Sequence, residues 1–238
     1  MEEKSKDIPL YLYFAEKFKQ KILSGELRPG DQFPPEIKLA KKYGVARVTI
    51  RNAINVLVQE KLIIRLKGKG SFVAEPKIER ELVNVASFTE RMQSRGMRAG
   101  ALCHEVKLIK ADTGLSQQLH IDLGSEVVEI VRIRLTNDNP VAIEKSYLPR
   151  DLCPGIEKEN LEDNSLYYIL DSKYSLQPAH SSKTIELARA TLDEAKLLHI
   201  PKGTPLFLIR ATVFTQTNQV MEFVNTLFLG DKFRFQVY

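Results

Sequence analysis

Hydrophobic residues recur at helical spacing through the first part of the chain. Between residues 8 and 24 they fall at every fourth position, which predicts one amphipathic helix over Ile8–Ser24 that buries Leu10, Phe14, Phe18 and Ile22. Leu39, Ala40 and Tyr43 mark a short second helix, and Gly44 follows where a left-handed cap would end it. A third helix is indicated by apolar positions at i, i+3, i+4 and i+7, namely Ile50, Ala53, Ile54 and Leu57.

The pattern then changes to that of a short β-ribbon. The segments 62–66 and 71–73 are strand-like, and they flank a basic glycine turn, Lys67-Gly68-Lys69-Gly70. Helices followed by a basic ribbon are typical of a winged helix-turn-helix, whose last helix is sized to enter the major groove of DNA.

Charge supports a DNA-binding first part. The chain has 35 Lys and Arg against 30 Asp and Glu, and residues 1–76 hold 15 of the basic but only 9 of the acidic residues. The excess positive charge therefore lies where a phosphate backbone would need it. The alternative is a solvated basic surface without a ligand.

The segment RPGDQFPPEIKLAKKYGVARVTIRNAINVLVQEKLI, followed by GKGSFV, resembles the DNA-binding domain of GntR-family bacterial transcription regulators over residues 8–73. The resemblance implies a winged helix-turn-helix over residues 1–74. Its DNA-contacting residues would be Lys38, Arg47, Thr49, Arg51, Lys67, Gly68, Lys69 and Gly70.

Three positions depart from the family pattern. Ile37 stands where the family usually has a DNA-contacting arginine, which removes roughly 1–3 kcal/mol of possible base discrimination. Pro35 and Ala46 stand where serine is common, and a serine at position 46 would cap the recognition helix, worth about 1 kcal/mol. The operator sequence therefore cannot be transferred from relatives.

The segment 75–81, EPKIERE, breaks the apolar periodicity and is interpreted as a linker. Beyond it, Leu119–Ser125 recurs as Leu198–Thr204, each at the end of a short helical segment (Leu115–Leu119 and Asp193–Leu198). An arginine and a glutamate twelve residues apart follow each copy, as Arg132/Glu144 and Arg210/Glu222. Unless the repeat is a coincidence, two helix–hairpin units predict an α+β domain with a mostly antiparallel, pseudo-twofold sheet.

Residues 82–238 resemble the UTRA effector-binding domain of the HutC subfamily within GntR, whose fold is similar to chorismate lyase. The resemblance rests on several segments in order: Ser87–Met92, Arg132-x-Arg134, Glu144-x-x-Tyr147-x-Pro149, Ser165–Tyr167, Gly203–Leu206 and Gly230–Phe235. It implies an α+β fold that binds a small-molecule effector and forms a homodimer.

Side chains alternate along the strand predicted at Val127–Leu135, so Arg132 and Arg134 share a face with two apolar neighbours. Buried guanidiniums need an anion, an acid or water. A hairpin loop of three or five residues places Glu144 opposite Arg134, whereas two or four residues place it opposite Ile133 on the other face. We favour the former, because a carboxylate between two arginines leaves one positive charge for a ligand.

The resemblance implies that Ser87, Phe88, Thr89 and Arg132 hold an anionic group, and the start of the helical segment Glu90–Arg95 would favour one. Hydroxyl or amino groups would then be bound by Glu144, Ser165, Tyr167 and Glu222. Phe228 replaces a tyrosine of sugar-phosphate-binding relatives. An amino-sugar phosphate is the leading hypothesis, beside other phosphorylated sugars, sugar–amino-acid conjugates and carboxylates. The alternative is an Arg–Glu network that only stiffens the sheet.

Other classes of protein are disfavoured. Adjacent Cys103 and His104 would point to opposite faces of a strand, and no nucleotide-binding, serine-hydrolase or metal-binding motif appears, so we expect no enzyme, cofactor or metal. The two cysteines favour reduced thiols over a redox pair. No apolar run spans a membrane and the N-terminus is not signal-like, so we expect a cytoplasmic protein. The resemblance favours a repressor over an activator, and a ligand-free architectural DNA-binding protein is the remaining alternative.

Overall fold

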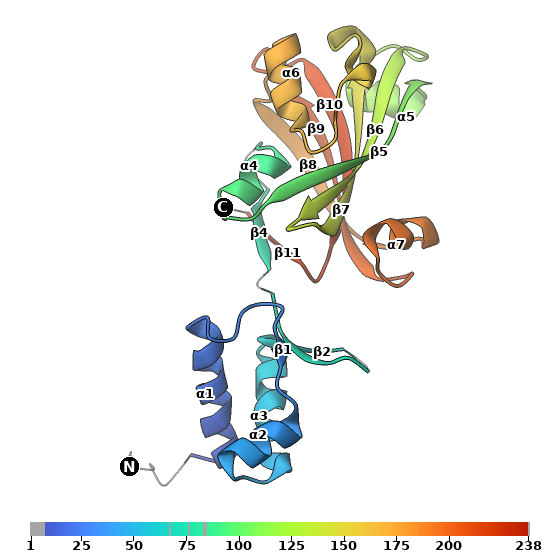
Figure 1. Ribbon diagram of the computed structural model, residues 1–238. Helices are drawn as coiled ribbons and strands as arrows, with labels where there is room; N and C mark the ends of the chain where they lie inside the picture. The colour runs from blue at the N-terminus through green and yellow to red at the C-terminus, as the bar shows by residue number, and fades with distance from the viewer. Residues whose placement is uncertain (1–7, 67, 76, 83–84, 238) are drawn as a thin grey trace. The chain divides into compact units, whose positions relative to one another are not determined.

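A computed structural model of the protein describes residues 8–66, 68–75, 77–82 and 85–237. The chain divides into two compact units, Met1–Pro76 and Lys77–Tyr238. Figure 1 shows the elements of each unit.

The first unit is a winged helix. Its elements are α1 (Leu10–Leu23), β1 (Gln32–Phe33), α2 (Glu36–Tyr43), α3 (Arg47–Gln59), β2 (Ile63–Leu66) and β3 (Gly70–Val73), and the strands form a sheet in the order β1-β3-β2. Phe18, Ile50 and Leu57 are at most 1% exposed and lie at the centre of its core. Gly44 ends α2 with a φ of 65°, as the sequence predicts. The first helix is one or two residues shorter at each end than predicted, with Pro9 at its N-cap position and Ser24 at its C-cap position.

The second unit is built on a six-stranded antiparallel sheet in the order β5-β6-β7-β10-β9-β8. Its strands are β5 (Ala99–Lys110), β6 (Glu126–Thr136), β7 (Asn139–Pro149), β8 (His180–Arg189), β9 (Pro205–Phe214) and β10 (Val220–Leu229). The helices are α4 (Phe88–Gln93), α5 (Thr113–Leu119), α6 (Leu166–Tyr174) and α7 (Leu192–Leu198), with short 3-10 turns at Arg150–Leu152 and Ile156–Lys158.

Helices cover both faces of this sheet. Val128 and Ile130 of β6 pack with Leu170 of α6 on one face, whereas Val131 of the same strand packs with Leu198 of α7 on the other. Figure 1 shows α4 and α6 on one side of the sheet and α7 on the opposite side. The face beneath α4 and α6 is the one that carries the buried polar residues described below.

The predicted repeat is visible as two copies of strand–helix–strand–strand, β5-α5-β6-β7 and β8-α7-β9-β10, whose last strands pair with each other. His120 and His199 of the repeated segment both end their helix in the left-handed conformation, each with a φ of 55°. The repeated histidines therefore mark helix ends.

The segment interpreted as a linker over residues 75–81 is in part a strand. Ile78–Glu81 forms β4, which pairs in parallel with β11 (Phe233–Gln236) at the far end of the chain. The linker interpretation is wrong for these residues. Their backbone partner is more than 150 residues away, so the local pattern of EPKIERE did not reveal it.

The β6–β7 hairpin also corrects the sequence analysis. Its loop is two residues, Asn137 and Asp138, both with positive φ. The initial register, Leu135 opposite Pro140, would bring Glu144 opposite Val131 on the other face. A bulge between Arg134 and Leu135 shifts the register by one residue, so Glu144 lies opposite Arg132 and not opposite Arg134. The favoured pairing was wrong, yet the bulge keeps Glu144 on the predicted face.

Candidate functional sites: a DNA-binding surface and a buried cationic cavity

The exposed face of α3 carries the side chains predicted to meet DNA. Arg47 and Arg51 are exposed in its first turns and Thr49 between them is half-buried. Ala46 at the start of α3 provides no side-chain cap, as its identity predicts. The unpaired amides of the first turn are therefore left to a phosphate or water.

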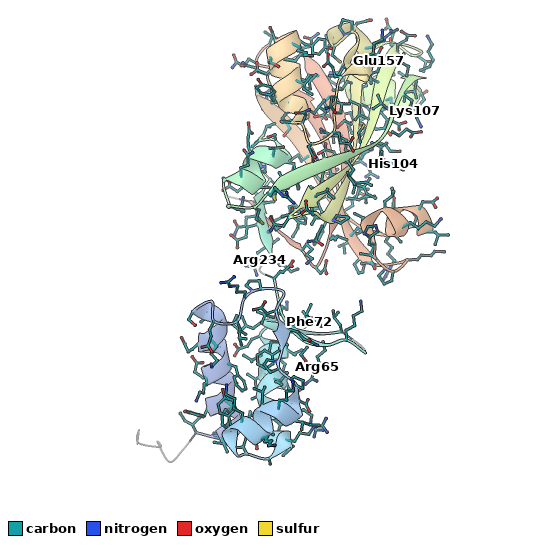
Figure 2. All side chains as sticks on the ribbon, viewed as in Figure 1. Arg65, Phe72, His104, Lys107, Glu157 and Arg234 are labelled. Carbon is teal, nitrogen blue, oxygen red and sulfur yellow. The ribbon has the colours of Figure 1, made fainter. Side chains whose placement is uncertain are left out.

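Arg47 is held by an acid of the neighbouring helix. Its Nε donates to Oε2 of Glu36 at 3.0 Å, and the other oxygen of Glu36 lies 3.9 Å from a guanidinium nitrogen of Arg65 on β2. Figure 2 labels Arg65 on the wing. Arg65 was not among the residues predicted to contact DNA. The sequence analysis included it only in the excess of basic residues over residues 1–76. Glu36 thus holds two exposed arginines together at the edge of the recognition helix.

The wing tip has the conformation that its glycines permit. Gly68 and Gly70 have φ of 77° and 112°, and Lys69 between them is exposed. The side chain of Gln32 donates to the carbonyl oxygen of Lys69 at 3.0 Å, which anchors the turn to β1. Lys67 lies outside the described residues. Lys38 and Ile37 are exposed on α2, so the position of the missing family arginine faces solvent.

In the second unit, a cavity lies between the sheet and the segment from β4 to α4. With its mouth included, its empty volume is about 380 Å³. Its polar lining consists of Arg80, Ser87, Arg132, Arg134, Glu144, Tyr167, Glu222 and Thr226. We call this space the first compartment.

Two buried arginines share one carboxylate in the first compartment. Arg132 and Arg134 are 1% and 3% exposed. Arg132 lies 2.5 Å from Oε1 of Glu144, and Nε of Arg134 donates to Oε2 at 3.2 Å. Nη1 of Arg132 also donates to the carbonyl oxygen of Asn164, but its Nε is buried and has no hydrogen-bond partner among the described residues. One guanidinium donor thus remains to be satisfied.

The charges of this cluster are strongly coupled. Burial alone would raise the pKa of Glu144, but the guanidiniums of Arg134 and Arg132 lower it to about 2. Burial, followed by the charge of Arg132, lowers the pKa of Arg134 to about 10. Glu144 is therefore ionised and neutralises only one of the two arginines.

A second acid, Glu222 of β10, also lines the first compartment. The hydroxyl of Tyr167 donates to Oε2 of Glu222 at 2.8 Å, and Glu222 is 2% exposed. Burial, followed by the charge of Glu144, raises the pKa of Glu222. Glu222 and Tyr167 can exchange hydrogen bonds with ligand hydroxyl or amino groups.

Ser87 and Phe88 line the compartment at the start of α4. The Ser87 hydroxyl accepts from the amide of Glu90 at 3.1 Å, and Glu90 accepts from the amide of Ser87 at 2.9 Å. This capping box fixes the start of the helix. The guanidinium carbon of Arg134 lies over the ring of Phe88, 5.1 Å from the centroid of that ring.

Three predicted effector residues do not line the first compartment. Thr89 follows the lining residues into α4, and Ser165 caps α6 through the amide of Tyr168. Phe228 is fully buried, with its ring centroid 4.7 Å from that of Phe233. The absent tyrosine hydroxyl is thus replaced by packing against the C-terminal strand.

Arg80 lines the compartment and was missed by the sequence analysis, which placed it in the linker. Its guanidinium lies 4.6 Å from the ring centroid of Phe228, and burial followed by the charge of Arg91 lowers its pKa to about 10. No local pattern marks Arg80, because β4 reaches the cavity only through its pairing with β11.

The part of the chain that the structure describes contains neither a disulfide nor a metal cluster. Cys103 and Cys153 form no disulfide, and no cluster of His, Cys, Asp and Glu has the arrangement of a metal site. None of the described helices is long and apolar enough to cross a membrane.

Two family descriptions match the chain. Residues 10–73 match the family described as bacterial regulatory proteins of the gntR family, and residues 94–234 match the UTRA domain. The transcriptional repressor NagR of Bacillus subtilis (strain 168) is 36% identical over 235 residues, which cover 99% of this chain and 96% of the repressor.

Two further relatives match most of the chain. The probable fructoselysine utilization operon repressor of Escherichia coli (strain K12) is 31% identical over 88% of this chain and 86% of its own length. The crystal structure of PhnF from Mycobacterium smegmatis superposes with a TM-score of 0.70 at 29% identity, covering 94% of this chain and 98% of PhnF.

Proposed function

The chain belongs to the GntR family of bacterial regulatory proteins, with a UTRA domain behind its DNA-binding domain, and we propose that it is a transcriptional repressor released from its operator by a small anionic metabolite. Within the family we place it in the HutC subfamily, with a second unit of the chorismate-lyase type. The observation that carries the proposal is the pair of buried arginines sharing one ionised glutamate.

An anionic effector follows from the charge of the first compartment. Arg80, Arg132 and Arg134 bring three guanidiniums to it, against the two carboxyl groups of Glu144 and Glu222, and the pKa of Glu222 is raised by burial. Arginine suits phosphate and carboxylate because its donors form a planar fork. The unpartnered Nε of Arg132 is one donor that a bound oxyanion would satisfy.

A sugar derivative fits the rest of the lining. Glu222, Tyr167 and Thr226 offer acceptors and hydroxyls for a polyhydroxylated or amino-bearing body. Relatives are named for a mannosyl-D-glycerate system and for fructoselysine utilization. We therefore propose a sugar phosphate, with an amino-sugar phosphate first, ahead of a sugar–amino-acid conjugate or a carboxylate.

Regulation would link this compartment to DNA binding in a homodimer. Two recognition helices would occupy half-sites of a pseudo-palindrome about one helical turn apart or a multiple of it. Effector binding would change how the two DNA-binding units are presented to the half-sites, and so lower operator affinity. A coupling free energy of ~1–3 kcal/mol would suffice to switch a promoter.

The competing interpretation is an Arg–Glu network that only stiffens the sheet. A thermal-shift screen against amino-sugar phosphates, other sugar phosphates and small carboxylates separates the two. A ligand that binds only the folded protein at 100 times its dissociation constant adds roughly 2.7 kcal/mol to the free energy of unfolding.

The screen is repeated with Arg132→Met and with a matched control, Arg210→Met. Arg210 is the repeat counterpart of Arg132, but it pairs with Glu186 and both side chains are exposed. We expect a hit that disappears in Arg132→Met and persists in Arg210→Met. A hit that survives in Arg132→Met places the effector elsewhere, and a panel without hits favours the stiffening network.

A further inference from the structure

A second cavity adjoins the first compartment and is lined by a different set of cations. It lies between β8–β9–β10 and the β4–α4 segment, with an empty volume of about 440 Å³ including its mouth. Its polar lining is Arg80, Arg91, Tyr167, Ser181, Lys183 and Thr226. We call this space the second compartment.

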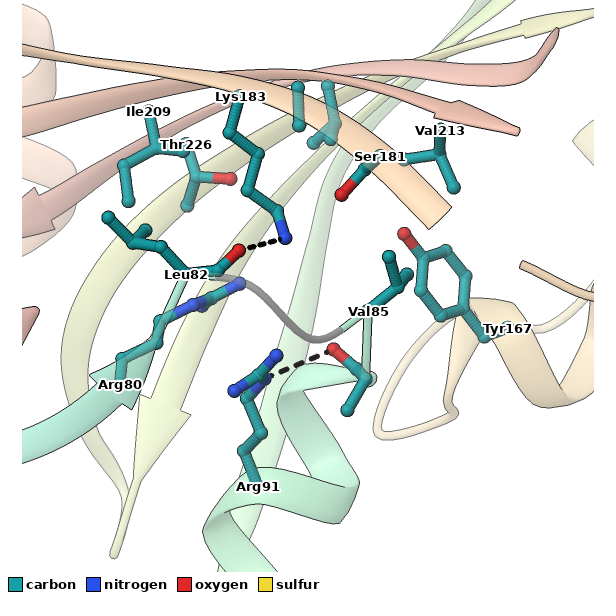
Figure 3. Close-up of a pocket in the computed structure, with 13 residues that line it drawn as sticks. Arg80, Leu82, Val85, Arg91, Tyr167, Ser181, Lys183, Ile209, Val213 and Thr226 are labelled. Carbon is teal, nitrogen blue, oxygen red and sulfur yellow. Dashed lines mark hydrogen bonds between the residues drawn. The ribbon is translucent and has the colours of Figure 1, made fainter. Parts of the chain in front are cut away.

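Three basic side chains reach the second compartment from three elements. Figure 3 shows Arg80 from β4, Arg91 from α4 and Lys183 from β8 extending toward the same space. Nε of Arg91 donates to the carbonyl oxygen of Ala86 at 3.3 Å, and Nζ of Lys183 donates to that of Leu82 at 2.5 Å. These backbone contacts help to hold Arg91 and Lys183 in place.

The cations repel one another. Burial, followed by the charges of Arg80 and Arg91, lowers the pKa of Lys183 to about 8. Burial also lowers the pKa of Arg91, and the charge of Glu81 opposes this effect. The charges of Glu144 and Tyr167 oppose the lowering of the pKa of Arg80. The net pKa shift of all three basic groups is therefore downward.

Ser181 provides an independent sign of a ligand. Its hydroxyl is buried and has no hydrogen-bond partner among the described residues, although it lines the second compartment beside Lys183. A buried hydroxyl without a partner costs free energy, which would be recovered if the hydroxyl donated a hydrogen bond to a bound oxyanion.

The two compartments adjoin each other. They share Arg80, Ala86, Tyr167, Val224 and Thr226 in their linings. A ligand that passed Tyr167 would reach from the Arg132–Arg134 pair to the Arg91–Lys183 pair.

We propose that the second compartment binds a second phosphate or carboxylate group through Arg80, Arg91, Ser181 and Lys183, so that an effector filling both compartments carries two separated anionic groups. The effector part of this statement rests on the proposed function. Anion binding by the second compartment stands independently of it.

Competitive acetylation of the full chain tests the site directly. Lysine reacts as the neutral amine, so Lys183 should be acetylated quickly near pH 7, whereas the exposed Lys202 serves as internal reference. Inorganic phosphate is the probe, compared with chloride at equal ionic strength, and mass spectrometry gives the rate at each lysine.

We expect phosphate to slow acetylation of Lys183 by about tenfold, because one unit of recovered pKa lowers the neutral fraction tenfold. Arg132→Met should retain this protection, whereas Arg91→Gln and the sterically mild Ser181→Ala should weaken it. Equal rates in phosphate and chloride overturn the proposal, as does protection that Arg132→Met removes and the other two variants keep.

The effector part is tested with the hits of the thermal-shift screen. Arg91→Gln should weaken binding of ligands with two anionic groups by about tenfold or more, the value of one lost charged hydrogen bond, and leave ligands with one group nearly unchanged. An equal loss of affinity for ligands with one and with two anionic groups contradicts a second subsite. Failure of the proposed function would give a different result, because Arg132→Met would then change the affinity for none of the ligands.

Discussion

Each unit of the protein contains an arginine paired with a glutamate, and the two pairs differ in almost every physical respect. Arg47 is exposed beside a half-buried Glu36, with a single 3.0 Å hydrogen bond. Arg132 is 1% exposed, and its partner Glu144 also binds Arg134. The first pair lies in water at the surface of α3, and the second lies between a sheet and two helices.

The difference shows why the same two residue types can serve opposite purposes. A pair at the surface contributes about 0–1 kcal/mol and is easily exchanged for a phosphate. A buried carboxylate that loses its place leaves two guanidiniums without compensation. Under the proposed function, DNA would displace Glu36 from Arg47, whereas Glu144 would stay in the site and an anion would bind beside it.

The largest expected effect comes from removing the buried acid. Glu144→Gln leaves Arg132 and Arg134 without a counter-charge, so we expect the free energy of unfolding to fall by roughly 3–5 kcal/mol. Urea denaturation measures it. The matched surface change, Glu36→Gln, should alter stability by less than about 1 kcal/mol. Equal effects of the two changes would remove the distinction between the pairs.

Arg47→Ala tests the surface pair through its effect on DNA binding. We expect specific operator affinity to fall by roughly 1–3 kcal/mol, the value of a guanidinium contact with a base, while the melting temperature stays nearly constant. Fluorescence anisotropy with specific and random duplexes measures both affinities. Unchanged operator binding would exclude Arg47 from the interface.

Glu36→Gln should have a smaller effect in the opposite direction. Loss of the carboxylate releases Arg47 and Arg65 to phosphates, so binding to DNA of any sequence should tighten at low salt. The slope of log affinity against log salt should steepen by about one unit. A slope that does not change shows that Glu36 does not compete with DNA.

The buried pair also predicts a dependence of stability on pH. The pKa of Glu144 is lowered in the folded protein from 4.5 to about 2, so its stabilising contribution is complete above pH 4.5 and is lost as the pH falls through about 2. The stability difference between the wild type and Glu144→Gln should therefore narrow over this interval. A constant difference in urea denaturation would show that Glu144 is not ionised in the folded state.

The helical part of the fold could be predicted from the sequence because its signals are local. The apolar spacing of Ile50, Ile54 and Leu57 and the cap at Gly44 lie within one element each, and the structure confirms them. The repeated Leu-His-Ile segment likewise predicted two equivalent helix ends.

The parts of the site that the sequence missed depend on distant pairing. Arg80 enters the first compartment because β4 pairs with β11, and Glu144 reaches Arg132 because of one bulge in β6–β7. The repeat does not extend to side-chain contacts, since Arg210 pairs with Glu186 and Glu222 with Tyr167. A bulge between Val220 and Glu222 shifts the pairing of β10 with β9.

The most direct measurement of the central claim is operator affinity with and without effector in two arginine variants. An operator selected from a random duplex pool and a ligand from the thermal-shift screen are titrated by anisotropy. We expect the ligand to weaken operator binding about tenfold or more in the wild type and in Arg210→Met, and to leave Arg132→Met bound. Equal release of Arg132→Met would contradict the account.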